Sequence, residues 1–341
     1  MKILIIGAGL AGVVAQNALS NHDLSIVDKK LDPDIFGDHS AVMRFRDDRL
    51  ANLLGISLKE VTVYKAYALG GQLCTEPNIT ANNCYSLKTH ESLSERSLKD
   101  CGVQKRYLFD SSIKAQRVIS GATLKCIYKE YDIDTGEKFI AQFSSSQMNT
   151  FEIQYDYCIS TIPMPTILKA AGIKHSIIFG SEVIHVYTAK INIPSDVHQT
   201  IYFPEADDPA YRITIEGQRI IAESMEELNG NDMCYLVDEF FGLHPNYYDD
   251  WKHSKQIGKL REVDSNRRKA MMVQLNKLNI YSLGRYATWR SIRADHLVGD
   301  IERIKHFINV SSEVRNYEGN INPEYSSCKG DDNPITIDET S

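Results

Sequence analysis

The sequence lacks the cysteine patterns that mark metal sites and disulfide frameworks. Its cysteines form no CxxC pair and no zinc-like cluster. There are seven of them, an odd number: Cys74, Cys84, Cys101, Cys126, Cys158, Cys234 and Cys328. Met1 and Lys2 lead directly into an apolar run, without the cleavage site of a signal peptide. We therefore expect free thiols, a reducing cytoplasm and no bound metal.

Long apolar runs and an excess of basic charge are also absent. No run approaches the roughly 20 residues that span a membrane, so we expect no membrane insertion. The net charge of −7 is unfavourable for non-specific binding to nucleic acid. The basic run Arg267-Arg268-Lys269 is interpreted as a solvated helix face. No internal repeat and no Ser-His-Asp constellation is visible.

The first thirty residues have the pattern of a dinucleotide-binding β-α-β unit. A β-branched apolar run at 3–6 predicts a buried parallel strand, and a helix over 13–19 and a second strand over 24–27 follow. Between strand and helix, Gly7 would make the tight turn, Gly9 would let a pyrophosphate approach the backbone, and Gly12 would let the helix pack on the sheet. The helix start would offer N–H groups and a positive dipole end to the phosphates.

An acidic residue stands where such units bind ribose. Asp28 ends the second strand, 21 residues after Gly7. At this position a carboxylate binds the ribose hydroxyls, and it disfavours a 2′-phosphate. NADP is therefore not the expected ligand.

Two later segments predict strands that end abruptly. Tyr155-Asp156-Tyr157-Cys158-Ile159-Ser160-Thr161-Ile162-Pro163-Met164-Pro165 reads as a strand that stops at two prolines, before a helix at 166–171. Asn279–Arg290 reads as a strand that enters a glycine turn at Gly284-Arg285, before a helix from about Asp295 to Phe307.

Together with the opening unit, these segments resemble the flavoprotein amine oxidase superfamily, and more closely its UDP-galactopyranose mutase and protoporphyrinogen oxidase-like branches. The resemblance covers residues 1–45 and 110–310 in pattern. It implies that the dinucleotide is FAD. It further implies that the strand ending in Ser-Thr-Ile-Pro closes the FAD domain, and that the strand ending in Gly-Arg returns to the FAD phosphates.

The resemblance also implies a role for individual residues. The opening loop and Asp28 would hold the ADP half, Val118 would contact adenine through its backbone, and Gly284 with Arg285 would meet the pyrophosphate and ribityl region. The helix start would stabilise negative charge on reduced flavin. The complete predicted cofactor set is Gly7, Ala8, Gly9, Leu10, Ala11, Gly12, Asp28, Lys29, Val118, Thr161, Gly284, Arg285, Asp295, His296 and Leu297.

The expected fold is α/β. A Rossmann-like FAD-binding domain, with a parallel sheet and a small antiparallel unit at 123–155, would be interleaved with an α+β substrate domain. The FAD domain is assigned residues 1–45, 105–165 and 280–315, the substrate domain 46–104 and 166–279, and a flexible tail 318–341. In the substrate domain we expect strands at 176–193, 199–203 and 210–224, the last with a turn at 216–218, and helices at 232–241 and 267–277.

Candidate substrate contacts are Arg44, Tyr211 and Arg212, although no catalytic residue is assigned. Arg44 and Arg46 follow His39 where amine oxidases carry a glycine–arginine loop against the flavin, but the paired glycines are missing here. Arg212 would clamp a carboxylate or phosphate. Further candidates to line the site are Tyr85-Ser86-Leu87-Lys88 and Arg96-Ser97. A solvated or packing role is the alternative for each, and His39, His185, His296 and Trp289 are interpreted as structural.

The leading hypothesis for function is an FAD-dependent oxidoreductase that oxidises the C–N bond of an amine or amino-acid-like molecule. A narrower variant rests on the YSLK and RS segments, which resemble oxidoreductases of bacteriophages. It makes a modified pyrimidine in phage DNA the substrate, although the acidic net charge gives DNA binding no support. The alternatives are a non-redox mutase similar to UDP-galactopyranose mutase, and an NAD-binding protein that is not an enzyme.

Overall fold

The first sheet of the computed structural model is parallel and has the order β16-β10-β1-β2-β6. The structure describes residues 1–32, 43–90, 101–109, 113–133, 136–146, 148–261 and 263–319. The strands of this sheet are β1 (Lys2–Ile6), β2 (Asp23–Val27), β6 (Val118–Ile119), β10 (Tyr157–Ser160) and β16 (Ile280–Ser282). β1 and β10 are buried on both faces, which explains their continuous apolar sequences.

Helices cover both faces of the parallel sheet. On one face Ile3 and Ile5 pack with α1 (Leu10–Ala18), α2 (Arg49–Leu54) and α7 (His296–Gly319). On the other face Leu4 and Ile6 pack with α4 (Met164–Ala170) and α6 (Ser265–Asn276). The same face carries an antiparallel unit of β7 (Ala122–Asp132), β8 (Gly136–Ser145) and β9 (Asn149–Tyr155).

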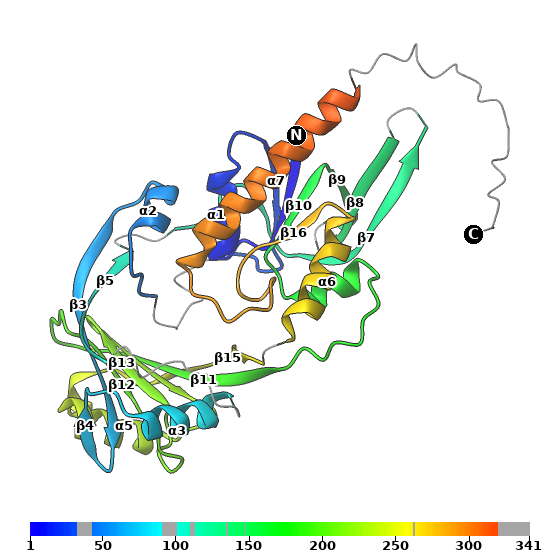
Figure 1. Ribbon diagram of the computed structural model, residues 1–341. Coiled ribbons are helices and arrows are strands. Elements are labelled where there is room, and N and C mark those ends of the chain that lie inside the picture. The colour runs from blue at the N-terminus through cyan, green and yellow to red at the C-terminus, as the bar shows by residue number, and fades with distance from the viewer. Residues whose placement is uncertain are drawn as a thin grey trace, which may run out of the picture.

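The second sheet has eight strands in the order β15-β11-β14-β13-β12-β3-β4, with β5 paired to β3. Figure 1 shows it at the bottom of the molecule, below the parallel sheet with α1 and α7. Its strands are β3 (Leu58–Leu69), β4 (Gln72–Cys74), β5 (Gly102–Phe109), β11 (Ser181–Lys190), β12 (His198–Tyr202), β13 (Arg212–Glu216), β14 (Arg219–Ser224) and β15 (Lys252–Leu260). It is accompanied by α3 (Ile79–His90), α5 (Gly230–Phe241) and a 3₁₀ turn, η2 (Pro245–Tyr247).

The two faces of this second sheet differ in chemistry. Ile201, Ile213 and Ala222 belong to one face and pack against Leu236 and Val237 of α5. On the opposite face the strand register places polar residues side by side, because paired residues of neighbouring strands share a face. These pairs are His198 with Glu216, Thr200 with Thr214, Tyr202 with Arg212, and Arg212 with Glu223. We call this the polar face.

The predicted fold class is confirmed. The parallel sheet, the antiparallel unit and the interleaved second sheet are all present, and the turn at 216–218 joins β13 to β14. Strands β3, β4 and β15 were not predicted from the sequence. α7 runs to Gly319, well beyond the predicted end near Phe307, and the rest of the predicted tail lies outside the described residues. No described helix combines the length and the apolar character needed to cross a membrane.

Candidate functional site

The opening loop, as we call residues 7–12, comprises the turn after β1 and the first residues of α1, at the carboxyl edge of the parallel sheet. Gly7 has φ +103°, and a Cβ there would lie 2.2 Å from Thr161 Oγ1. A Cβ on Gly12 would lie 2.0 Å from the Gly7 carbonyl oxygen. The fold itself therefore requires glycine at both positions, for the turn and for the close approach of the helix to the strand.

Gly9 differs from these two glycines. It stands before the first turn of α1 with φ −69°, which any residue adopts, and it is exposed. A Cβ on Gly9 would meet nothing within 4 Å, and no described side chain caps the helix. Packing within the protein thus gives no reason for glycine here, whereas a ligand resting against the N–H groups of the helix start would.

Asp28 fixes the opening loop from the end of β2. Its Oδ2 accepts a hydrogen bond from the Ala8 N–H at 2.6 Å, and its Oδ1 accepts one from the Lys30 N–H at 2.7 Å. The Gly7 N–H donates to the Val27 carbonyl at 2.8 Å. Lys29 is exposed, and Val118 pairs with Ile26 on the neighbouring strand β6. The predicted ribose-binding carboxylate is therefore next to the loop.

Hydroxyl groups gather where β10 and β16 end. Thr161 Oγ1 lies 3.0 Å from the Ile6 carbonyl oxygen and 3.2 Å from that of Gly7, so it holds the turn after β1. Ser160 and Ser282 are register partners in β10 and β16. Their hydroxyl groups are buried and have no hydrogen-bond partner among the described residues. Buried donors without partners at this edge fit a polar ligand that would satisfy them.

The predicted glycine turn after β16 does reach the opening loop. Gly284 has φ +95°, and a Cβ there would lie 3.0 Å from the Ala11 Cβ and 3.6 Å from Leu297 Cδ2. Three segments far apart in the sequence thus meet at one point. The side chain of Arg285 leaves this point, because its Nη2 donates to the Gly258 carbonyl of β15 at 2.6 Å.

The start of α7 carries a buried acid. Asp295 is 5% exposed, and its Oδ2 lies 3.6 Å from Arg293 Nε. Burial, together with the nearby charge of Asp47, raises the pKa of Asp295 above its ordinary value. The adjacent His296 is exposed and Leu297 is buried. The predicted helix start therefore lies beside Gly284, with a carboxylate at its tip.

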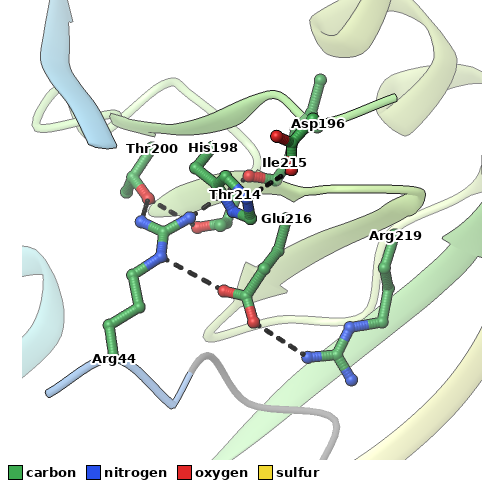
Figure 2. Close-up of polar contacts among 8 residues, drawn as sticks. All are labelled: Arg44, Asp196, His198, Thr200, Thr214, Ile215, Glu216 and Arg219. Carbon is green, nitrogen blue, oxygen red and sulfur yellow. Dashed lines mark hydrogen bonds and ion pairs between the residues drawn. The ribbon is translucent and has the colours of Figure 1, made fainter. Parts of the chain in front are cut away.

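Arg44 links the two sheets. The adjacent Phe45 packs in the core of the first sheet, and the Arg44 side chain contacts the polar face of the second sheet. Its Nε lies 3.2 Å from Glu216 Oε2, its Nη1 donates to Thr200 Oγ1 at 2.9 Å, and its Nη2 donates to the Ile215 carbonyl at 3.2 Å (Figure 2). The side chain is 6% exposed. Burial lowers the pKa of Arg44 and Glu216 opposes the shift. Arg44 joins the two parts of the molecule, and the substrate contact predicted for it stays a prediction.

Beside this contact lies an imidazole. His198 Nε2 is 3.5 Å from Asp196 Oδ1, and Glu216 also faces Arg219 at 3.7 Å (Figure 2). The pKa of His198 is lowered by burial and by the charge of Arg44, while Asp196 and Glu216 act in the opposite direction. His198 therefore favours the neutral form.

Tyr211 and Arg212 share one buried carboxylate. Arg212 Nε donates to Glu223 Oε2, and the Tyr211 hydroxyl donates to Glu223 Oε1 at 3.1 Å. Burial alone would raise the pKa of Glu223, but Arg212, Lys259 and the Tyr211 hydroxyl together outweigh burial, and the pKa is lowered. Lys259 Nζ lies 4.6 Å from the ring centre of Tyr211. Arg212 is thus already paired within the protein, with its Nε committed to Glu223.

The remaining candidates have structural contacts. Tyr85 packs edge-on against Tyr202, with ring centres 5.4 Å apart. Lys88 Nζ donates to four backbone carbonyls between 203 and 210, and burial lowers its pKa to about 8. Trp289 packs edge-on against Phe179 and donates its indole N–H to the Arg261 carbonyl. His185 lies 3.1 Å from His253, and Arg46 is exposed. His39 and Arg96-Ser97 lie outside the described residues.

Two residues that organise the polar face were not identified from the sequence, Glu216 and Glu223. The signal was present in the alternation of β13, where Arg212, Thr214 and Glu216 are every second residue. This alternation with a period of two places the polar residues of β13 on one face of the strand and its isoleucines on the other.

No protein-family model matches the chain, and no curated protein matches its sequence. Solved structures do. An oxidoreductase from Methanosarcina mazei is similar with a TM-score of 0.53 and 9% identity, over 90% of this chain and 100% of that one. A geranylgeranyl bacteriochlorophyll reductase-like protein from Thermoplasma acidophilum is similar with a TM-score of 0.51 and 13% identity, over 95% and 80%. The p-nitrophenol 4-monooxygenase of Pseudomonas putida is similar with a TM-score of 0.50 and 10% identity, over 89% and 78%.

Two longer structures are covered in smaller part. The chain spans 60% of the length of aklavinone-11 hydroxylase, solved with FAD and aklavinone, at a TM-score of 0.49, and 58% of the length of RebC. At identities near 10% these likenesses show the fold, an α/β architecture shared with oxidoreductases. None of the five is described as an amine oxidase or a mutase.

Proposed function

We propose that this chain binds FAD and is an FAD-dependent oxidoreductase. The observation that carries the proposal is Gly9, whose lack of a side chain serves no packing need and leaves open space at an uncapped helix start. Asp28 beside the loop favours a dinucleotide without a 2′-phosphate. The fold that the chain shares with oxidoreductases supports a flavin over a purely structural NAD.

The chain's own residues would divide the work between the two sheets. The opening loop, Asp28 and the Ser160–Ser282 hydroxyls would hold the ADP half and the pyrophosphate. The turn at Gly284 and the start of α7 would lie near the ring system. FAD, when bound, would supply an acceptor for two electrons. The polar face, with Arg44 and Arg212 already fixed by carboxylates, would form the opposite wall and orient the substrate.

Substitution of Gly9 by Asp tests the cofactor proposal. Aspartate is a favoured residue before a helix and suits the dipole, so the apo protein should become more stable by a few tenths of a kcal/mol. Its carboxylate would repel the pyrophosphate, so flavin should be lost from the purified protein. Absorbance near the flavin bands and urea unfolding give the two readings.

Gly230→Asp is the matched control. Gly230 also stands at a helix start, in α5, and a Cβ there meets nothing within 4 Å. It should leave the flavin content unchanged. If Gly9→Asp keeps a full complement of flavin, the opening loop does not hold the cofactor. A wild-type protein that is colourless would favour the NAD-binding alternative.

The finer proposal for the reaction is oxidation of a C–N bond, and it rests on the resemblance to the amine oxidases. Anaerobic addition of amines, amino acids or amino-acid-bearing pyrimidine nucleosides should then bleach the flavin. Turnover only after dithionite reduction, without net electron flow, would instead indicate a mutase. The likeness to p-nitrophenol 4-monooxygenase favours a second candidate, hydroxylation of a phenol. That reaction would show as oxygen consumption dependent on a phenol and a reduced nicotinamide nucleotide.

The domain boundaries and a cytoplasmic location stay predictions. β5 crosses the predicted boundary at residue 105 and pairs with β3 along its whole length. We propose that the boundary lies closer to residue 110. Among the described cysteines, Cys74, Cys84, Cys126, Cys158 and Cys234 carry free thiols.

A further inference from the structure

A cavity of about 460 Å³ lies between the start of α6 and the segment 289–291. It is on the α4 and α6 side of the parallel sheet, where Trp289 joins the core, whereas α1 packs on the other side. The opening loop contributes no residue to its lining. The cavity is therefore a separate feature from the pyrophosphate loop.

The sequence segment that supplies the lining is basic, in contrast to the whole chain, and three of its arginines face acids outside the segment: Arg261 faces Glu182, Arg290 faces Asp300 and Arg293 faces Asp295. Residues 261–293 contain eight lysines and arginines and two acids, whereas the complete chain carries a net charge of −7. Two of these arginines line the cavity, Arg268 from α6 and Arg290 from the segment 289–291. A concentration of positive charge around a concave surface favours an anionic ligand.

The acid in the lining is Asp264, and one of its carboxylate oxygens is occupied by backbone N–H groups. Asp264 caps α6, and its Oδ1 accepts from the N–H groups of Asn266 at 3.1 Å and Arg267 at 2.9 Å. Arg290 is held in place by Asp300 and by its bond to Thr288 Oγ1 at 3.0 Å. One cation of the cavity is thus fixed by the fold, and the second, Arg268, is half-buried on the first turn of α6.

We propose that this cavity binds the oxyanion, a phosphate or a carboxylate, of a second ligand that is distinct from the dinucleotide. Arg268 and Arg290 supply the charge, Ser265 and Ser291 supply hydroxyl groups, and the Trp289 ring supplies an apolar wall, since its N–H is bonded to Arg261. A volume of about 460 Å³ exceeds the need of a single oxyanion, so the site takes part of a larger molecule.

The test is a calorimetric titration of inorganic pyrophosphate, and in a second arm of succinate, into the purified protein at low salt. If pyrophosphate binds more tightly, the site is assigned to a phosphate. If succinate binds more tightly, it is assigned to a carboxylate. Arg268→Gln should weaken binding of the tighter ligand about tenfold or more. Arg267→Gln is the matched control, because it removes the same charge from the same helix at an exposed position outside the lining, and it should change the affinity less than twofold.

Three results would overturn the proposal. The first is that neither anion shows saturable binding at millimolar concentration. The second is an equal loss of affinity for the anion in Arg267→Gln and Arg268→Gln. The third is a loss of flavin in Arg268→Gln, which would assign the cavity to the cofactor. Gly9→Asp should leave binding of the anion intact. A failure of the cavity proposal is therefore distinguishable from a failure of the flavin proposal.

Discussion

The two sheets of this molecule prepare for a ligand in opposite ways. At the carboxyl edge of the parallel sheet the strand ends carry glycines, hydroxyl groups and open backbone N–H groups, with Asp28 the acid that fixes the loop. On the polar face of the second sheet the positive charges of Arg44 and Arg212 are already paired with Glu216 and Glu223. The first region relies on fixed dipoles, which need no counter-charge, and the second on ion pairs, which carry a large desolvation penalty and depend on both partners.

The largest effect is expected where one partner of a buried pair is removed. Glu223→Gln leaves the Arg212 guanidinium without its carboxylate, so unfolding in urea should show a loss of about 3–5 kcal/mol. The double variant Glu223→Leu with Arg212→Met removes both charges and should recover most of this loss. A single variant that loses less than about 1 kcal/mol would show that water reaches the pair, and the contrast between the two sheets would fail.

For the carboxyl edge of the parallel sheet, which relies on helix and backbone dipoles, the sharpest test is a substitution at Gly12. Gly12→Ala places a Cβ 2.0 Å from the Gly7 carbonyl, so α1 must shift, at a cost of about 1–3 kcal/mol in unfolding free energy and with loss of flavin. Gly9→Ala, at the open position three residues earlier, should lose less than about 1 kcal/mol. Equal losses in thermal unfolding would contradict the separate roles assigned to the two glycines.

The same contrast explains what the sequence could predict. The opening loop was recognisable because turn, close approach and helix start are local demands on Gly7, Gly9 and Gly12. The ends of β10 and β16 were recognisable because prolines and a glycine stop the strands abruptly. The position of Thr161 and Gly284 beside the loop agrees with these patterns.

The polar face could not be predicted in the same way, because its contacts are long-range. Arg44 and Glu216 are 172 residues apart, and the sequence around either residue does not predict a contact with the other. β15 was missed because it is mostly exposed at the sheet edge and lacks an alternating apolar pattern. The direction of Arg285, toward β15 and away from the loop, follows from that same unpredicted strand.

Asp295 gives a further test of the comparison, because it is a buried acid beside the start of α7, in the region that relies on dipoles. Its raised pKa means that ionisation opposes folding: the cost is absent below the ordinary value of 3.8 and grows as pH rises through the folded pKa. Asp295→Asn removes the ionisable group and should stabilise the protein by about 1 kcal/mol at pH 7, with no gain near pH 3. A loss of stability at pH 7 would show that the Arg293 contact dominates.

The smallest effect concerns His198 on the polar face. Because burial and Arg44 lower its pKa, the folded protein binds fewer protons at this site than the unfolded chain does. Stability is then complete above the unfolded value of 6.5 and falls as pH drops toward the folded pKa. His22 and His185 have lowered pKa values as well and act in the same direction. His198→Gln should therefore reduce the loss of unfolding free energy between pH 7 and pH 5.5 by a few tenths of a kcal/mol. If the loss is steeper in the variant, protonated His198 must be stabilised by Asp196. Protonation of His198 in acid would then stabilise the folded protein, contrary to expectation.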